Sequence, residues 1–378
     1  MDAEHFSRAV HALPLIDHHV HSVLPRDLER VEFEVHLSES AVAAPAGTTH
    51  LDSQAGFAAR RHCAPLLDLP AHSAADAYLA RRAELGWREA TARLLHASGV
   101  STSLIDTGHA GTSLLSNPDF AALSAQEVRE IVRLESVAER LIDAGVAAHD
   151  FPDALRRALG EAAATGAAGF KSVIAYRAGF DVDPERPSDA EAIAAVADER
   201  RTNADAPARV SHPDLLRFLL WSGADTGLPL QLHVGYGDAD LDLARCNPAL
   251  LMPWLRRLPD DASPIMLLHC YPYHREAGYL AQVFPNVYFD LGLAINYTGA
   301  ASTAVIREGL ELAPFGKLLY SSDAWGLPEL HLLGAQLWRD GLARALWEFV
   351  ERGEWSESEA LRVAELTSSE NARRVYQL

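Results

Sequence analysis

The chain has 378 residues, of which 48% are hydrophobic and 22% charged, as in ordinary globular proteins. Its formal charge of −19 disfavours proteins that bind phosphate backbones, so we expect no nucleic-acid partner. Three scattered cysteines are too few for a disulfide framework or a cysteine-based zinc site. The N-terminus lacks an apolar stretch of signal-peptide length, and no later run approaches about 18 apolar residues. We therefore expect a cytoplasmic protein without a membrane partner.

Short β-rich runs recur along the chain, and segments with helical periodicity follow them. This alternation is typical of a parallel α/β fold. We interpret eight runs as strands: residues 14–20, 101–108, 129–136, 169–176, 228–235, 263–270, 286–292 and 317–323. Eight such units favour a closed (β/α)8 barrel, the TIM-barrel architecture, over an open doubly wound sheet. No Gly-Xaa-Gly-Xaa-Xaa-Gly turn follows the first run to support the open sheet.

Three longer segments interrupt or extend this repeat. Residues 22–99 are too long for a strand-to-helix loop and carry helical patterns, so we predict a helical insertion over the barrel mouth. Residues 181–210 indicate a shorter excursion with one helix, and residues 329–378 indicate three C-terminal helices. No internal repeat and no linker rich in Pro, Gly or Ser divides the chain, so we expect residues 1–378 to form a single domain.

Histidines and an aspartate stand at the ends of the predicted strands, which is where the reactive residues of such barrels lie. Asp17, His19 and His21 form an Asp-Xaa-His-Xaa-His motif, and strand alternation points the two histidines to the same side. The fifth, sixth and eighth runs close with His233, His269 and Asp323. Nitrogen and oxygen ligands of this kind suit zinc, manganese or iron. The pattern therefore predicts a divalent-metal site in the axial cavity.

Residues just beyond the strands are candidates for contact with a substrate. Tyr176 and Arg177 follow the fourth run, and a planar guanidinium can hold a carboxylate through two hydrogen bonds. A surface ion pair is the alternative for Arg177. His274, after the sixth run, could line the mouth, whereas Trp325 and Asp238 could either line the pocket or pack elsewhere. The histidines of the insertion have no ligand spacing and are interpreted as surface or packing residues: His36, His50, His62, His72 and His96.

The segment Asp17-His18-His19-Val20-His21, with the three later ligands, resembles the amidohydrolase superfamily. Four longer segments are similar to one branch of it: GFKSVIAYR, LPLQLHVGYGD, LLHCYPYHREAGYLA and KLLYSSDAWGLPEL. That branch includes the amidohydrolase-like domain fused ahead of a glutamine synthetase domain in nodulin-type and fungal developmental proteins. The resemblance spans nearly the whole chain and implies a metal-dependent TIM-barrel hydrolase.

The resemblance also implies roles for individual residues. His19, His21, His233 and Asp323 match the metal ligands of the first, fifth and eighth strands, and Asp323 also moves the proton of the attacking water. His269 matches a sixth-strand histidine that binds a second metal in binuclear members and contacts the substrate in mononuclear ones. Lys171 stands where binuclear members carry a carboxylated lysine, and a charged lysine that binds substrate or pairs with an acid is the alternative. The cofactor is then one or two divalent ions, with zinc as first choice.

Hydrolysis of a carbon–nitrogen amide bond in a small molecule is the leading functional hypothesis, and the nodulin-type branch implies a γ-glutamyl amide. Non-oxidative decarboxylation of an aromatic or enol carboxylate is the main alternative, and sugar-acid isomerisation is a third. A barrel used only as a scaffold has no chemical need for the complete ligand set. Neither a Gly-Xaa-Ser-Xaa-Gly turn nor a Cys/His nucleophile context supports a covalent acyl-enzyme. Homo-oligomers are common among such barrels.

Overall fold

The computed structural model describes residues 2–109, 113–202, 206–259 and 261–378. Seven parallel strands form one sheet in sequence order, and each strand pairs with its neighbours along the chain. The strands are β1 Leu15–Val20, β2 Val100–Asp106, β3 Glu127–Arg133, β4 Gly169–Ser172, β5 Leu230–Val234, β6 Ile265–His269 and β7 Val287–Phe289. This sequential parallel order with intervening helices is the order of a TIM barrel.

An eighth segment, residues 317–323, lies between β7 and β1. The amide of Leu319 donates to the carbonyl of Phe289 over 3.0 Å, and the amide of Asp323 donates to the carbonyl of His19 over 3.1 Å. Its pairing with β7 is an isolated bridge rather than a continuous ladder. The predicted α/β barrel is confirmed, but the eighth run is an extended segment held by single bonds rather than a regular strand.

Apolar side chains fill the end of the barrel at which the strands begin. They form a cluster of Ile16, Leu104, Ile131, Met266, Leu268 and Leu319 with Val375 and Tyr376. The last two belong to the C-terminal helix α17, which contacts β1. The C-terminal helix therefore covers this end of the barrel, and the carboxyl ends of the strands remain for chemistry.

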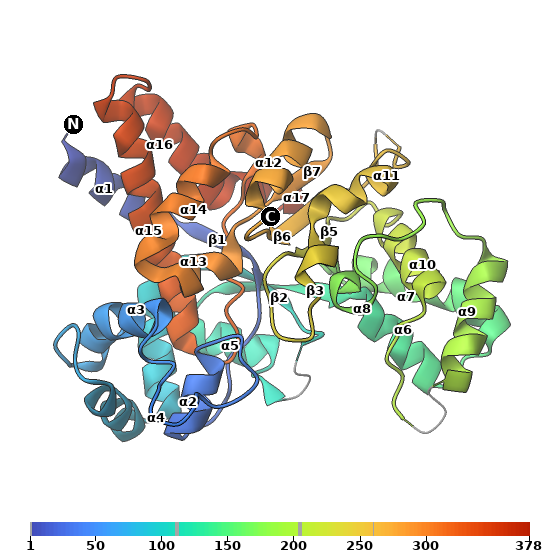
Figure 1. Cartoon of the computed structure of the whole chain (residues 1–378), viewed down its shortest axis with the longest axis horizontal. Coiled ribbons are helices and arrows are strands. Elements are labelled where there is room, and N and C mark those ends of the chain that lie inside the picture. Colours follow the sequence, from blue (N-terminus) through green and yellow to red (C-terminus); the bar gives the residue numbers. More distant parts are fainter. Residues whose placement is uncertain (1, 110–112, 203–205, 260) are drawn as a thin grey trace.

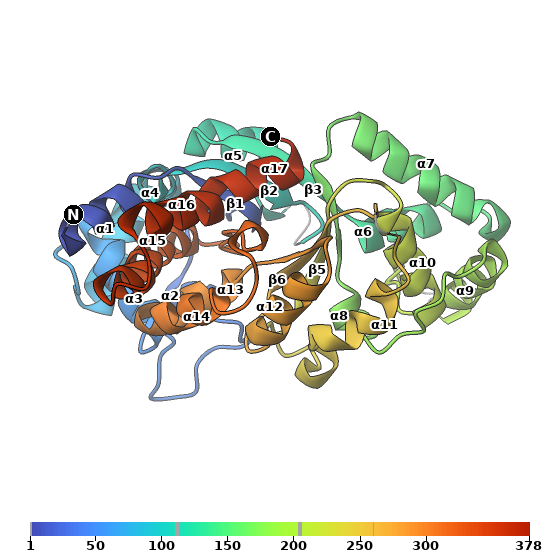
Figure 2. The same ribbon diagram turned by 90° about the horizontal axis from the view of Figure 1, so that it is seen from above.

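Two groups of helices flank the strands (Figure 1). Helices α1, α3, α4 and α15 lie on one side, and α6, α7, α9 and α10 lie on the other; the view in Figure 2 shows the same division. The helices are α1 Ala3–His11, α2 Arg30–His36, α3 Gln54–His62, α4 Ala75–Ser98, α5 Asn117–Ser124, α6 Leu134–Asp143, α7 Phe151–Ala164, α8 Ile174–Arg177, α9 Asp189–Thr202, α10 Pro213–Ala224, α11 Met252–Leu255, α12 His274–Val283, α13 Gly292–Thr298, α14 Ser302–Gly309, α15 Pro328–Glu351, α16 Glu357–Glu365 and α17 Asn371–Tyr376.

The predicted insertion of residues 22–99 is helical and contains α2, α3 and α4. Only its first part lies over the barrel mouth, where residues from 35 to 41 line a cavity. Helices α3 and α4 instead pack against α15 beside the barrel. The α2 region and the loop after it thus lie at the cavity, whereas α3 and α4 lie against α15.

Three other predictions concern element boundaries. The excursion of residues 181–210 contains one helix, α9, and the C-terminal segment contains α15, α16 and α17, as predicted. The predicted fourth strand, residues 169–176, is too long: β4 ends at Ser172 and the short helix α8 follows. Among the described residues, no helix combines the length and the apolar character that crossing a membrane requires.

Candidate metal centre and active site

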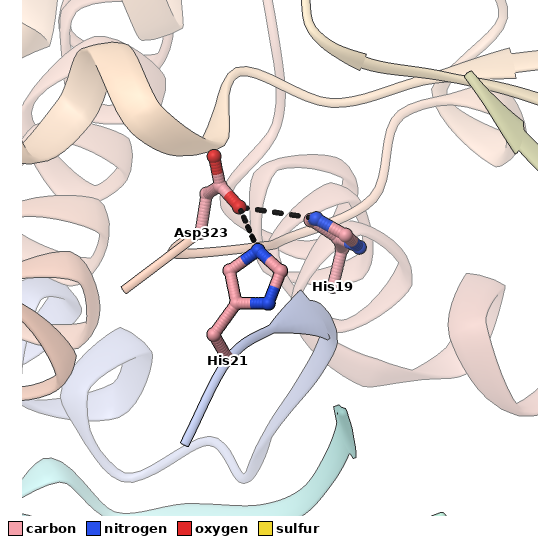
Figure 3. A group of neighbouring side chains, drawn as sticks. All are labelled: His19, His21 and Asp323. Atoms are coloured by element: carbon pink, nitrogen blue, oxygen red, sulfur yellow. Dashed lines mark ion pairs between the residues drawn. The ribbon is translucent and has the colours of Figure 1, made fainter. Parts of the chain in front are cut away.

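His19 of β1, His21 directly after β1 and an aspartate of the closing segment meet at the carboxyl end of the barrel (Figure 3). The Nε2 atoms of His19 and His21 lie 3.0 Å and 3.5 Å from Oδ1 of Asp323. One ligand atom from each of the three residues lies within 4.8 Å of the other two. Two imidazole nitrogens and a carboxylate oxygen in this arrangement fit a divalent metal ion.

His269 and His233 extend this group. Nε2 of His269 lies 3.2 Å from Oδ2 of Asp323, and the rings of His269 and His233 are 4.7 Å apart. Nε2 of His233 and Nδ1 of His269 are buried, and no described residue gives them a hydrogen bond. Because an unpaired buried polar atom is costly, these nitrogens fit a bound ion or a substrate group.

Hydrogen bonds from the opposite ring nitrogens hold His19 and His21. Nδ1 of His19 lies 2.8 Å from Oε1 of Gln231, and Nδ1 of His21 lies 3.0 Å from the backbone carbonyl of Asp106. A carbonyl oxygen can only accept, so Nδ1 carries the proton in each ring. Nε2 then keeps its lone pair for a metal, which is the usual arrangement of a metal-binding histidine and its outer partner.

Strand β1 departs from simple alternation. Its register with β2 shifts between Asp17 and Val20. His18 therefore also faces the barrel interior, where Nδ1 lies 3.0 Å from the hydroxyl of Tyr376 and Nε2 lies 2.9 Å from Oδ2 of Asp290. His18 thus links the site to the segment directly after β7 and to the C-terminal helix.

Two of the candidate ligands have left-handed backbone conformations, with φ of +67° at His269 and +49° at Asp323. Such conformations cost free energy for residues other than glycine and persist where the surroundings enforce them. Asp290 Oδ1 accepts from the amide of His269 over 2.7 Å. Asp17 accepts from the amide of Ser322 over 3.0 Å and from its hydroxyl over 2.5 Å. These bonds hold the two ligands in place.

Lys171, at the end of β4, is buried, and its Nζ lies 3.3 Å from Nε2 of His19. Burial lowers the pKa of Lys171 to about 8, although Asp106 and Asp323 oppose the fall. An amine with a lowered pKa is more often uncharged at neutral pH, which suits carboxylation, and a protonated amine there would face the substrate. Its position beside His19 is compatible with both roles predicted for it.

A cavity of about 420 Å³ opens at this group. Its lining includes five of the six predicted metal-site residues: His21, Lys171, His233, His269 and Asp323. Tyr176 and Arg177 also line it, together with the two residues left ambiguous by the sequence, Asp238 and Trp325. The structure therefore brings the predicted metal site and most of the predicted substrate contacts to one cavity.

Arg177 is only partly paired. Its Nη2 donates to Glu139 over 3.2 Å, whereas its Nε and Nη1 are buried without a hydrogen-bond partner among the described residues. Tyr176 packs its ring 4.6 Å from the ring of His233, and burial raises the pKa of its hydroxyl, which stays protonated at neutral pH. Arg177 thus keeps donors for an anionic group, and Tyr176 keeps a hydroxyl donor beside a candidate ligand.

Two histidine assignments need correction. His274 does not line the cavity, because its Nε2 lies 2.6 Å from Oε2 of Glu308 in α14 and its ring stacks on Tyr271. His36, interpreted as an ordinary surface or packing residue, does line the cavity and packs its ring 4.7 Å from that of Trp325. The substrate contact predicted for His274 is therefore withdrawn.

Sequence reasoning missed several residues of the site: Glu39, Asp106, His109, Arg133, Gln231 and Asp290. His109 packs its ring 4.8 Å from that of His21, and Arg133 pairs with Asp106 over 2.6 Å. Asp106 and Arg133 are the last residues of β2 and β3. Their positions at strand ends were the signal that could have found them. Glu39 lies in an irregular loop and carries no such signal.

The family model for amidohydrolases matches residues 16–378. The chain belongs to the amidohydrolase family. This amidohydrolase is 28% identical to a protein described as a metal-dependent hydrolase from Lactobacillus casei ATCC 334, with a TM-score of 0.85 over 98% of this chain and 97% of that one. The agreement in fold, family and ligand geometry makes it a member of the metal-dependent hydrolases and confirms the resemblance seen in its sequence.

Two further relatives share part of the sequence or the fold of this chain. The amidohydrolase is 35% identical to Protein fluG of Emericella nidulans over 223 residues, which are 56% of this chain and 25% of fluG. The chain thus matches about a quarter of that longer protein, in keeping with the similarity to the branch fused to glutamine synthetase domains. A uronate isomerase from Bacillus halodurans C-125 is 15% identical with a TM-score of 0.63 over 99% of this chain and 96% of that one, which shows the shared fold alone.

Proposed function

We propose that this amidohydrolase cleaves a carbon–nitrogen amide bond of a small molecule, with γ-glutamyl amides as the preferred class. The observation that carries the proposal is the convergence of imidazole nitrogens and the Asp323 carboxylate at one cavity. Membership in the amidohydrolase family supports the reaction type. The match to fluG supports the branch from which the γ-glutamyl group is inferred.

His19, His21, His233 and Asp323 would hold a divalent ion, with zinc as first choice and manganese or iron as alternatives. Such an ion supplies a water with a pKa near 7 and polarises the scissile carbonyl. His269 and Lys171 would hold a second ion if Lys171 is carboxylated, and otherwise would contact the substrate. Two ions per chain would favour the carboxylated lysine, and one ion would exclude a bridging role for it.

Other side chains around the cavity would transfer the proton and bind the substrate. Asp323 would accept the proton of the attacking water and return it to the leaving amine, because it is the carboxylate nearest to three of the histidines. Arg177 would bind a carboxylate of the substrate through its two unpaired nitrogens. Tyr176 would donate its hydroxyl to the substrate beside His233.

Release of amine from a panel of γ-glutamyl amides tests the proposal. We expect hydrolysis by the purified chain and a loss of about 100-fold or more in kcat for Asp323→Asn. The matched control Asp52→Asn, an exposed residue of the insertion, should keep the wild-type rate. Carbon dioxide release from aromatic acids would instead favour decarboxylation, and interconversion of sugar acids would favour isomerisation.

A further inference from the structure

Glu39 places a carboxylate in the cavity, and this carboxylate is not one of the candidate metal ligands. It lies in the loop after α2 and lines the same cavity as Asp323. Its Oε1 atom is buried, and no described residue gives that atom a hydrogen bond. A buried carboxylate oxygen without a partner costs free energy that a bound cationic group can offset.

The cations near Glu39 along the chain are committed elsewhere. Arg30, at the start of α2, donates to Glu34 over 2.7 Å, and Arg26 donates to Glu32 over 2.8 Å. No ion pair to Glu39 is found among the described residues, although two arginines and a lysine line the same cavity.

Those three cations also have other contacts. Arg133 pairs with Asp106 over 2.6 Å, Arg177 pairs with Glu139 over 3.2 Å, and Nζ of Lys171 lies beside His19. Each of these described cations thus has a contact other than Glu39.

The groups that face Glu39 are acids and a phenol. Burial raises the pKa of Glu39 to about 7. The negative charges of Asp323 and Asp238 add to this rise, and the hydroxyl of Tyr297 opposes it. Asp238 lines the cavity with Glu39, and it comes from the loop after β5. A positively charged ligand group placed between these acids would remove their mutual repulsion.

We infer that Glu39 binds a protonated amine of the substrate, so that the amidohydrolase acts on amides that carry an alkylammonium group. The inference rests on the proposed amide hydrolysis and names its substrate class. The ammonium could come from the acyl part, as in the α-amino group of a γ-glutamyl unit, or from a second amine on the leaving part. Both sources present the same chemistry to the carboxylate.

Binding of three ketomethylene analogues to the purified full chain tests the inference. In each analogue a methylene replaces the amide nitrogen, so no bond can be hydrolysed and binding is measured without turnover. The parent analogue has a carboxylate on the acyl part and a butyl group on the other side. The second adds an amino group next to the carboxylate, and the third adds one at the end of the butyl group.

We expect one of the two amino-bearing analogues to bind about 10- to 100-fold more tightly than the parent by isothermal titration calorimetry. The preferred analogue identifies the source of the ammonium. The Glu39→Gln variant should lose this preference. It should still bind the parent analogue as tightly as the wild type does, and this binding shows that the variant is folded. Glu29→Gln, an exposed residue at the start of α2 with the same change of charge, should keep the preference.

The inference is overturned if the wild type does not distinguish the amino-bearing analogues from the parent, including the case in which it binds none of them. It is also overturned if Glu39→Gln keeps the preference. Failure of the proposed hydrolysis would appear separately, as absence of amine release from true amides by a protein that still prefers an amino-bearing analogue.

Discussion

Oε1 of Gln231 lies 2.8 Å from Nδ1 of His19, and this contact fixes the orientation of a candidate metal ligand. The amide group of Gln231 is itself held, because its Nε2 donates to the hydroxyl of Tyr376 and to the carbonyl of His18, each over 2.8 Å. The last helix of the chain therefore contributes to the geometry of the metal site through one glutamine, although it supplies no ligand.

Gln231→Ala should weaken metal binding by about 10- to 100-fold, because the ring of His19 loses the acceptor that fixes its orientation. Competition with a chromophoric chelator measures the affinity. Gln282→Ala, an exposed glutamine of α12, is the matched control and should bind metal as the wild type does. Equal affinities in all three proteins would show that the contact does not orient the ligand.

Tyr376→Phe should lower the free energy of unfolding by about 1–3 kcal/mol, because it removes the hydroxyl that is the shared hydrogen-bond partner of the buried Nδ1 of His18 and the buried amide of Gln231. Urea unfolding followed by tryptophan fluorescence measures the change. Tyr279→Phe removes a hydroxyl from a side chain that is 42% exposed and should change stability by less than about 0.5 kcal/mol. A similar loss in both variants would contradict the role of the buried hydroxyl.

The stability of the wild type relative to Glu39→Gln should fall as the pH rises from 4.5 to about 7. The ordinary pKa of the side chain is 4.5, and burial raises the pKa of Glu39 in the folded protein to about 7. Between these values the folded state binds more protons than the unfolded state, so raising the pH favours unfolding. Denaturant titrations across this range should show a relative loss of about 1–3 kcal/mol. A constant difference between the two proteins would contradict the raised pKa.

His274→Ala should leave the KM for a hydrolysed amide within about twofold of the wild type, because the residue lies outside the cavity. The variant should instead lose about 1–2 kcal/mol of stability with the contact to Glu308. Steady-state kinetics and urea unfolding measure the two effects. Tyr176→Phe serves as the comparison inside the cavity, and there KM should rise while stability changes little. A large rise of KM in His274→Ala would restore its predicted contact with the substrate.

Most of the barrel could be predicted from sequence because buried parallel strands have a strong local pattern. Apolar runs with histidine at or near their ends located β1, β5 and β6, together with the candidate ligands His19, His21, His233 and His269. The segment before Asp323 is also apolar, yet it pairs with β7 through an isolated bridge only. Local sequence does not show whether a run forms a continuous ladder.

Residues that act through tertiary contacts could not be predicted. Gln231 precedes His233 by two residues, on the same face of β5. Only the tertiary structure, with the C-terminal helix packed against Gln231, shows that it reaches His19. His36 and Glu39 come from an irregular insertion, so no spacing relates them to the strands. His274 follows its strand closely, but the start of α12 directs it toward α14.

The metal content of the purified protein, measured by inductively coupled plasma mass spectrometry, tests the central claim most directly. We expect at least about one divalent ion per chain in the wild type and in the surface control His149→Ala, and a loss of the ion in His19→Ala. Full metal content in His19→Ala, or a wild type that binds no divalent ion when supplied with zinc, manganese or iron, would contradict the account.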